Sequence, residues 1–526
     1  MASVIFEGKE DFFMSSNDIL IIVAIVLYLA FMITVGVVTS KKNKSSDDFY
    51  LGGRRLGPFV TAMSAEASDM SGWLLMGLPG LALMTGLAEA VWTAVGLSIG
   101  TYINWLIVAK RLRVYSEKIN AVTIPEFFSK RFGDTKNVLS VIAAVIIIVF
   151  FIPYTASGFS ACGKLFGTLF NMDYHLAMIL SAAVIVLYCT LGGFLAASTT
   201  DFIQSIVMTI ALVTVVGLGA GAVNGFGSVF DNVRGFDGYL DVFKGFNVAE
   251  NTTGSYGALP VASTLAWGLG YFGMPHILLR FMAIDDPNKL KTSRRVASVW
   301  VVISMGVAIL IGVVGYSLMK EGIVPAYDSA SAAETIIVDI SKYISLKNGF
   351  FAFLAGVFLS GILASTMSTA DSQLIAASSS VTQDILVDTL KLKLSGKKVM
   401  LIARLSVIVI ALIAVIFAWD PTSSVFRIVS FAWAGFGAAF GPVILLGLFW
   451  KRSNKWGALA GMVAGGAMIF IWKFGIAKIG GVFAIYELLP AFLCGLVAMV
   501  AVSLLTEAPD SDVKAQFDQV QTSLKA

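Results

Sequence analysis

Charged residues are scarce in this chain. Aspartate, glutamate, lysine and arginine make up 13% of its 526 residues, whereas apolar residues make up 57%. A soluble protein of this length could not cover its surface with so few charges, so we expect the chain to be solvated mainly by lipid. Its net charge of +4 is small and needs no nucleic-acid partner.

Residues that carry catalytic or metal chemistry are equally few. The two histidines and three cysteines lack the spacing of a zinc site or a disulfide framework. No Gly-Lys pair is followed by the hydroxyl residue of a phosphate-binding loop, which argues against ATP hydrolysis. Neither an arginine-rich helix nor a selectivity-filter motif indicates a channel. We therefore expect neither an enzyme nor an organic cofactor.

Long apolar runs, by contrast, are abundant. A run of about 20 such residues can cross a bilayer as a helix, and these runs lack the alternation of a membrane barrel. The sequence thus predicts an all-α polytopic membrane protein with about 13 transmembrane helices. The runs lie at roughly 18–39, 56–84, 86–109, 137–166, 175–197, 202–225, 258–282, 294–319, 349–383, 399–418, 424–449, 456–475 and 483–505.

Lysine and arginine are concentrated in the loops after the first, third, seventh, ninth and eleventh runs. Positive charge near helix ends stays on the cytoplasmic side, so the N-terminus should lie outside and the C-terminus in the cytoplasm. We expect a multi-pass protein of the inner cell membrane. Residues 1–506 would form one transmembrane domain and residues 507–526 a cytoplasmic tail.

Two runs contain segments that a plain lipid-facing helix would avoid. Residues 64–72 in the second run hold two carboxylates and three hydroxyls, and residues 267–275 in the seventh hold three glycines and a proline, which remove helical hydrogen bonds. Transporters built from inverted repeats place broken helices at corresponding points of their two halves. The offset of five runs therefore predicts repeats over about 56–225 and 258–449.

Asp69 lies in the first of these segments. A carboxylate at membrane depth costs roughly 2.5–3.5 kcal/mol unless a cation or water offsets it, so we favour a functional role over an interhelical salt bridge or a water-filled packing defect. Ser365, Ser368, Thr369 and Ser372 share one face of the ninth run. Their oxygens suit a hard monovalent cation; the alternative is helix packing, with each hydroxyl bonded to its own helix.

Aromatic residues flank the second break. Trp267 and Tyr271 lie one turn apart, and together they could offer a small cyclic solute an apolar wall with polar edges. Tyr154, directly after Pro153 in the fourth run, could serve in the same way. Ordinary core packing is the alternative for all three aromatic residues.

These residues lie in motifs that resemble the solute:sodium symporter family, and the resemblance covers nearly the whole chain. Within the family, the motifs are more similar to the proline branch than to the branches for sugars, sialate or pantothenate. The resemblance implies a leucine-transporter-type fold, a five-plus-five inverted repeat with extra spans at both ends. It also implies import of L-proline with one sodium ion by alternating access. The most specific stretches are LGGRRLGPFVTAMSAEASDMSGWLLMGLPG at 51–80, TLGGFLAASTTD at 190–201, WGLGYFGMPHILLRFMA at 267–283 and SFAWAGFGAAFGPV at 430–443.

Matching motif to motif, the resemblance also implies both sites. Arg54 and Asp201 match positions tied to transport rate, with a positive-inside anchor and a loop charge as their alternatives. The implied sodium-site residues are Ala67, Asp69, Met70, Ser365, Ser368 and Thr369. The implied proline-site residues are Ser71, Tyr154, Trp267, Tyr271 and Pro275.

Two features depart from the family's pattern. Ser365-Thr366 replaces a more apolar pair, and Glu66 stands where the proline branch has a small or uncharged residue. Glu66 could be protonated, could pair with a basic residue, or could help bind a second cation. We favour protonation, because we expect no basic residue within the second, seventh or ninth run.

Two rival functions remain open at this point. The first is the same kind of transporter for another solute. The second is a transporter-like sensor or channel, although a tail of about 20 residues is too short for a signalling domain. The expected partners are L-proline, sodium and the lipid bilayer, and no obligate protein partner is indicated.

Overall fold

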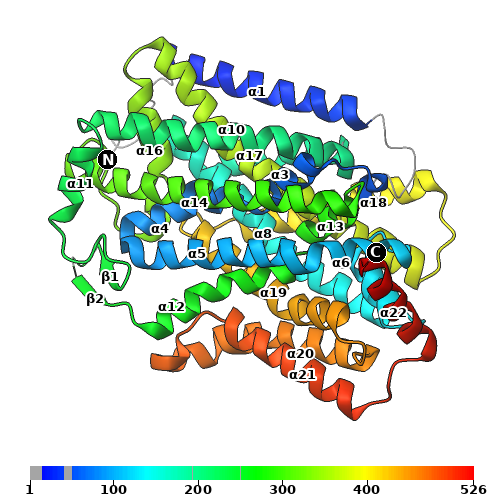
Figure 1. Cartoon of the computed structure of the whole chain (residues 1–526). Coiled ribbons are helices and arrows are strands. Elements are labelled where there is room, and N and C mark those ends of the chain that lie inside the picture. Colours follow the sequence, from blue (N-terminus) through cyan, green and yellow to red (C-terminus); the bar gives the residue numbers. More distant parts are fainter. Residues whose placement is uncertain (1–14, 41–49, 192, 249, 251, 526) are drawn as a thin grey trace, which may run out of the picture.

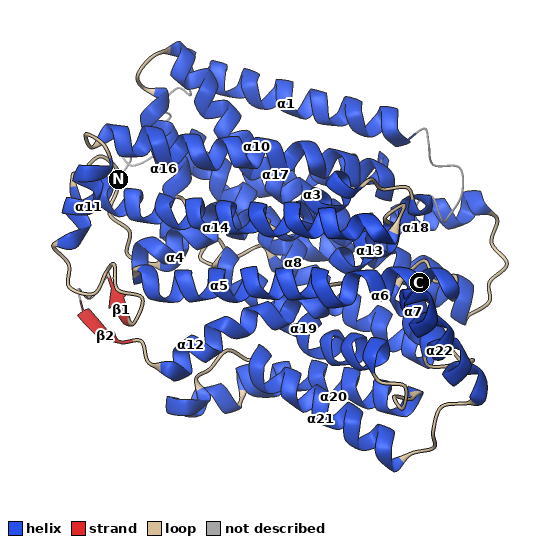
Figure 2. Ribbon diagram, in the orientation of Figure 1, coloured by secondary structure: helices blue, strands red, loops and turns tan. Residues whose placement is uncertain are grey.

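The computed structural model describes residues 15–40, 50–191, 193–248, 250 and 252–525, and most of them are helical (Figure 2). The long helices run side by side between two ends of the molecule (Figure 1). One end carries α11 (Phe226–Arg234) and the antiparallel strands β1 (Lys244–Asn247) and β2 (Thr252–Ser255). We call it the hairpin end. The other, the tail end, carries α22 (Ser511–Lys525).

The predicted apolar runs correspond to helices in the described chain, and two of these helices are broken. Ten helical stretches of the described chain are long and apolar enough to cross a membrane. The other three runs are the broken second and seventh and the shorter α9. The long helices are α1 Ser16–Ser40, α5 Leu87–Ile103, α8 Val138–Phe170, α9 Tyr174–Leu191, α10 Phe194–Ala222, α14 Leu290–Lys320, α17 Gly349–Ser379, α18 Gly396–Phe417, α19 Val425–Phe449, α20 Lys455–Phe474 and α21 Leu488–Leu505.

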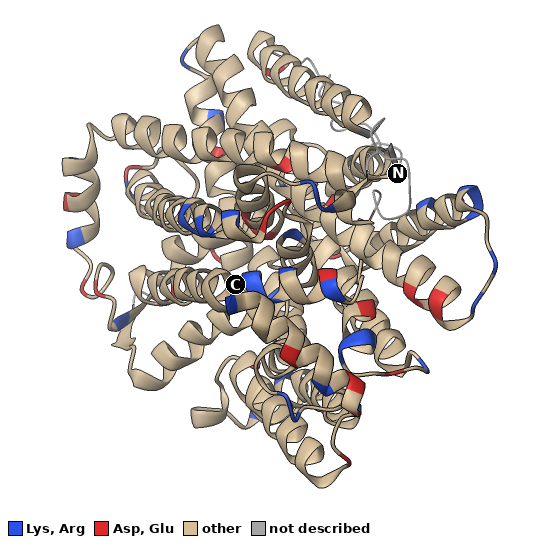
Figure 3. Ribbon diagram, turned by 45° about the vertical axis from the view of Figure 1, so that its right-hand side comes forward, with Lys and Arg blue, Asp and Glu red and all other residues tan. Residues whose placement is uncertain are grey.

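Shorter helices form the broken runs and the connections. They are α3 Pro58–Asp69, α4 Leu78–Thr85, α6 Ala109–Lys118, α7 Ile124–Arg131, α12 Ala258–Leu265, α13 Pro275–Ala283, α15 Ala330–Ala333 and α16 Ile336–Ser345. Lysine, arginine, aspartate and glutamate gather mainly near helix ends and in connections (Figure 3). This distribution fits helices whose middles face lipid or one another.

Both predicted breaks are present. In the second run, α3 ends at Asp69, Met70 leaves the helical region at ψ 69°, and a π-helical turn at Trp73–Gly77 leads into α4. In the seventh run, a 3₁₀ segment at Ala266–Phe272 separates α12 from α13, which restarts at Pro275. Proline fits there because the first residues of a helix have no intrahelical partner for their N–H groups.

The glycines of the second break permit close packing. A Cβ at Gly270 would lie 1.9 Å from Nε1 of Trp433 on α19. A Cβ at Gly100 on α5 would lie 2.3 Å from the carbonyl oxygen of Gly268. Larger residues could not be accommodated without moving backbone or a buried indole. The glycines therefore allow the 3₁₀ segment to pack tightly between α5 and α19. The sequence predicted that these glycines interrupt the helix, but it did not predict this packing role.

Other helices surround this centre. α1 packs on α10 and α17, while α20 and α21 pack together against α19. The predicted tail is helical where described, since α22 lies against α6 with Phe517 and Val520 buried. The small hairpin is the one departure from the all-α prediction among the described residues.

Candidate functional site

The break after α3 exposes backbone groups that other elements then bind. The carbonyl oxygen of Asp69 accepts hydrogen bonds from Nε1 of Trp73 at 3.0 Å and from the hydroxyl of Tyr154 at 3.1 Å. Ser71 is buried in the same turn, and its backbone N–H also donates to Asp69. The break is thus a polar point within an apolar core, held to α8 through Tyr154.

The carboxylate of Asp69 is fully buried. Its Oδ2 accepts a hydrogen bond of 2.7 Å from the hydroxyl of Tyr271, whereas Oδ1 has no hydrogen-bond partner within the described structure. The structure therefore joins the two broken helices directly, because Asp69 ends α3 and Tyr271 lies in the 3₁₀ segment. Among the described residues Asp69 forms no ion pair, so the salt-bridge alternative is wrong.

The hydroxyl face of α17 crosses α3 one turn from the break. Oγ of Ser368 donates to the carbonyl oxygen of Ala67 at 2.7 Å. Thr369 is buried, and its hydroxyl has no hydrogen-bond partner in the described chain. Ser365 and Ser372 bond to carbonyls of their own helix, as the packing alternative predicted. The face thus divides: the hydroxyl of Ser368 bonds to α3 as well as to its own helix, and that of Thr369 is left without a partner among the described residues.

A cavity of about 1190 Å³ lies between the centre and the hairpin end. Its rim includes α15, the first residues of α19 and the connection between α20 and α21. Trp267 forms part of its wall, with its ring 5.1 Å from that of Tyr486 and 5.2 Å from that of Phe426. Ser71, Tyr154, Tyr271 and Pro275 are buried beyond the residues that line the cavity. Of the five residues predicted for the proline site, Trp267 is therefore the one that reaches the wall of this cavity.

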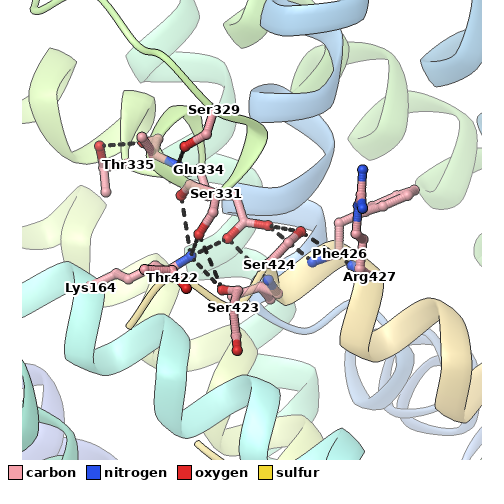
Figure 4. A network of polar contacts seen from close by, with 12 residues as sticks. Lys164, Ser329, Ser331, Glu334, Thr335, Thr422, Ser423, Ser424, Phe426 and Arg427 are labelled. Carbon is pink, nitrogen blue, oxygen red and sulfur yellow. Dashed lines mark hydrogen bonds and ion pairs between the residues drawn. The ribbon is translucent and has the colours of Figure 1, made fainter. Parts of the chain in front are cut away.

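The rim contains a buried ion pair that the predictions missed (Figure 4). Nζ of Lys164 on α8 lies 2.6 Å from Oε2 of Glu334 and also donates to the carbonyl of Ser423 at 2.8 Å. Glu334 accepts hydrogen bonds from the backbone N–H groups of Val425 and Phe426. A carboxylate at a helix N-terminus is favourable because those N–H groups lack intrahelical partners. The pair ties α8 and the α15–α16 segment to the start of α19.

A second buried ion pair lies on the tail-end side of the break. Nη2 of Arg280 on α13 lies 3.1 Å from Oδ2 of Asp201 and donates to Ser372 at 2.6 Å. Ser64 on α3 donates to the same Asp201 oxygen at 2.7 Å. Asp201 lies inside α10 and is fully buried, so the loop-charge alternative is wrong. Arg280 lies within the seventh predicted run, so the expectation of no basic residue there is also wrong.

The tail end is closed by backbone contacts of arginine side chains. Arg54 donates to the carbonyls of Met282 at 2.6 Å and Ala121 at 2.7 Å. Arg113 on α6 donates to the carbonyl of Ile284 at 2.7 Å. The backbones of Leu56 and Ile284 run as a short parallel bridge beside them. The entries to α3 and α13 are thereby held together.

A signal for the missed residues was present in the sequence. Lys164 and Arg280 each interrupt an apolar run, and an ionisable residue inside such a run marks a polar contact. Glu334 lies outside the runs, and nothing local distinguishes it from an ordinary loop glutamate.

Comparison with known proteins identifies the family. A match to the sodium:solute symporter family covers residues 49–465. The chain belongs to this family. It is therefore a multi-pass membrane transporter coupled to sodium.

Several relatives of this symporter have printed names that give a solute. The osmoregulated proline transporter OpuE of Bacillus subtilis is 43% identical, over 96% of this chain and 99% of the relative. The high-affinity proline transporter PutP of the same species is 41% identical, over 94% and 100% of the two chains. A sodium/proline symporter of Escherichia coli is 39% identical, over 94% and 95%.

Solved structures confirm the leucine-transporter-type fold. A Na⁺-coupled sialic acid symporter in a substrate-bound outward-open state matches with a TM-score of 0.76 at 18% identity, over 95% of this chain and 100% of the other. Mhp1, a nucleobase-cation-symport-1 family transporter, matches with a TM-score of 0.52 at 13% identity, over 91% and 99%. At these identities the likeness concerns the fold alone.

Proposed function

We propose that this symporter imports L-proline together with sodium by alternating access. The names of its relatives support proline as the solute, since they match this chain over nearly its whole length at 39–43% identity. One structural observation carries the proposal. The broken helix α3 presents a free carboxylate oxygen of Asp69 and the carbonyl oxygen of Ala67 in the buried centre of the protein.

The proposed sodium site lies between α3 and α17. The 2.7 Å contact of Ser368 with the Ala67 carbonyl and the unpartnered hydroxyl of Thr369 support it. Sodium favours oxygen ligands of this kind. The full proposed set is Ala67, Asp69, Met70, Ser365, Ser368 and Thr369.

The proposed proline site lies next to the break, below the wall of the cavity. Proline is a rigid ring with a carboxylate and an ammonium group, so an aromatic wall and freed backbone groups suit it. The hydrogen bonds of Tyr154 and Tyr271 to Asp69 support a site that responds to the ion. The proposed set is Ser71, Tyr154, Trp267, Tyr271 and Pro275.

The proposed orientation puts the hairpin end outside and the tail end in the cytoplasm. A cavity at the hairpin end and arginine contacts at the tail end then correspond to an outward-facing state. Transport would require the two ends to exchange these roles. The proposed repeats, about 56–225 and 258–449, each contain one break and would move against each other.

The sodium gradient supplies enough free energy for accumulation. One positive charge crossing 100 mV contributes about 2.3 kcal/mol, and a tenfold sodium gradient contributes about 1.4 kcal/mol. Together these allow proline to accumulate by a factor of several hundred. Proteoliposomes with an imposed sodium gradient test the function directly. Uptake of labelled proline should stop without sodium, and a preference for another solute in the same assay would reject proline.

Replacing Ser368 or Thr369 with alanine should raise the sodium concentration for half-maximal uptake by roughly tenfold, because a lost oxygen ligand costs about 1–2 kcal/mol. Proline affinity at saturating sodium should change much less. Ser360→Ala is the matched control, since its hydroxyl bonds only to Gly356 on the same helix. Equal effects on both ligands would indicate a packing role.

Replacing Trp267 with alanine should weaken proline binding by roughly tenfold or more, because a buried aromatic wall typically contributes at least 1–2 kcal/mol. Tyr271→Ala should weaken proline binding as well, and it should also impair sodium use, since it removes the partner of Asp69. Half-saturation for proline in proteoliposomes is the measurement. Trp92→Ala on α5, whose indole bonds to Val242 near the hairpin end, is the control. An unchanged value for Trp267→Ala would move the solute site elsewhere.

A further inference from the structure

Two groups of buried oxygen atoms lie around α3. The proposed sodium site includes the first group and, from the second group, only Asp69. The first group faces α17 and contains the Ala67 carbonyl with Ser368 and Thr369. The carboxylates of Glu66 and Asp69 make their hydrogen bonds on another side of α3. Glu66 contacts Trp105, which follows α5, and Asp69 contacts Tyr271 in the 3₁₀ segment. These two carboxylates are three residues apart and so share one side of α3.

Each side chain of the second group has one partner and one unsatisfied oxygen. Nε1 of Trp105 donates to Oε1 of Glu66 at 2.9 Å, and Tyr271 donates to Oδ2 of Asp69. Nδ2 of Asn104 donates to the carbonyl of Tyr271 at 2.9 Å. Within the described residues, the second carboxylate oxygen of Glu66, that of Asp69 and Oδ1 of Asn104 are buried without a hydrogen-bond partner.

Thr101 belongs to the same group. It lies in the last turn of α5, just before Asn104 and Trp105, and its buried hydroxyl is also without a partner in the described chain. The close packing of Gly100 on Gly268 fixes this part of α5 against the 3₁₀ segment. Asn104 begins a π-helical turn, Asn104–Val108, a local widening that often marks functional sites. We call Glu66, Asp69, Thr101 and Asn104 the α5-side group.

The charge of this group is not balanced by protein. The structure gives Glu66 and Asp69 no ion pair with any described lysine or arginine, and Arg280 is engaged by Asp201. Both carboxylates lie close enough for their charges to act on the hydroxyl of Tyr271. Two buried anions this close require a cation or protons. A cation bound among these groups would offset the charge and supply a partner to the free oxygens at the same time.

We propose that the α5-side group is a second monovalent-cation site, with sodium as its occupant. Four buried side-chain oxygens, two of them from carboxylates, have no partner among the described residues, and their side chains gather around Tyr271 where the two broken helices meet. A hard cation prefers oxygen ligands of this kind. Glu66, Thr101 and Asn104 belong to this site alone, whereas Asp69 is shared with the proposed sodium site beside α17. This inference goes beyond the proposed function, which needs a single sodium ion, and it does not depend on proline being the solute.

Equilibrium binding of radioactive sodium to the purified full-length protein, without proline, tests the proposal. The wild type should bind two sodium ions per chain and Glu66→Gln one. Asn104→Ala should keep the charge and weaken one of the two ions by roughly tenfold, since it removes one neutral ligand. Ser368→Ala should weaken the other ion. Glu89→Gln, a half-buried glutamate in the first turn of α5, is the matched control and should retain both.

The outcomes separate this site from the proposed function. One sodium ion in both the wild type and Glu66→Gln, or two in both, would overturn the α5-side site and leave sodium-coupled transport intact. No sodium in the wild type would overturn both proposals. If Glu66→Gln does not elute as a single folded species in size-exclusion chromatography, Asn104→Ala decides: two ions of unchanged affinity would reject the site.

Discussion

Asp69→Asn should raise the sodium concentration for half-maximal proline uptake by roughly ten- to a hundredfold, and at ordinary sodium concentrations little transport should remain. Asp69 ends α3 at the break, and its free Oδ1 is buried. Interactions with a charged group contribute about 1.5–3 kcal/mol, and each 1.4 kcal/mol is a factor of ten. Asparagine has nearly the same shape, so the change removes charge with little effect on packing.

Sodium titrations of proline uptake in proteoliposomes measure this effect. The amount of protein in the membrane should match the wild type, because the hydrogen bond from Tyr271 can still be accepted by the amide oxygen of asparagine. Asp420→Asn serves as the control, since Asp420 lies in an exposed connection and accepts its hydrogen bonds from Thr422. If Asp69→Asn has the sodium dependence of the wild type, Asp69 is not part of the sodium site.

Arg280→Gln should destabilise the folded protein more than any other single change considered. Arg280 is buried against Asp201, and Asp371 lies beside them with one unpartnered oxygen. Removing one partner of a buried pair costs about 3–5 kcal/mol, because the remaining charge stays in a medium of low polarity. The same network joins α3, α10, α13 and α17 through Ser64 and Ser372, so the loss should affect the whole centre.

Thermal unfolding of the purified protein checks this prediction. The double variant Arg280→Gln, Asp201→Asn should recover a large part of the loss, since it removes the stranded charge together with its partner. Lys289→Gln is a control, because its pair with Asp285 is solvent-exposed and contributes little. If the single and double variants unfold at the same temperature, the pair does not stabilise the fold.

The two buried ion pairs lie on opposite sides of the break and join different elements. Lys164 and Glu334 join elements at the rim of the cavity, whereas Arg280 and Asp201 lie toward the closed tail end.

The sequence by itself determined the class of protein and the positions of its breaks. Apolar runs of membrane length predicted the helices because no other structure satisfies every backbone group in lipid. The carboxylates of 64–72 and the proline at 275 predicted interruptions that the structure contains at Met70 and before Pro275. These properties are local, since each depends on residues within one run of the chain.

Only the tertiary structure decided which polar groups meet. Asp69 lies against Tyr271, Glu66 against Trp105 and Arg280 against Asp201, pairs separated by 202, 39 and 79 residues. The rotation of each helix about its axis sets these contacts, and that rotation depends on packing, such as the approach of Gly100 to Gly268. The sequence could place a carboxylate at membrane depth, but the fold decides which neighbours it meets, because helix packing brings together residues far apart in the chain.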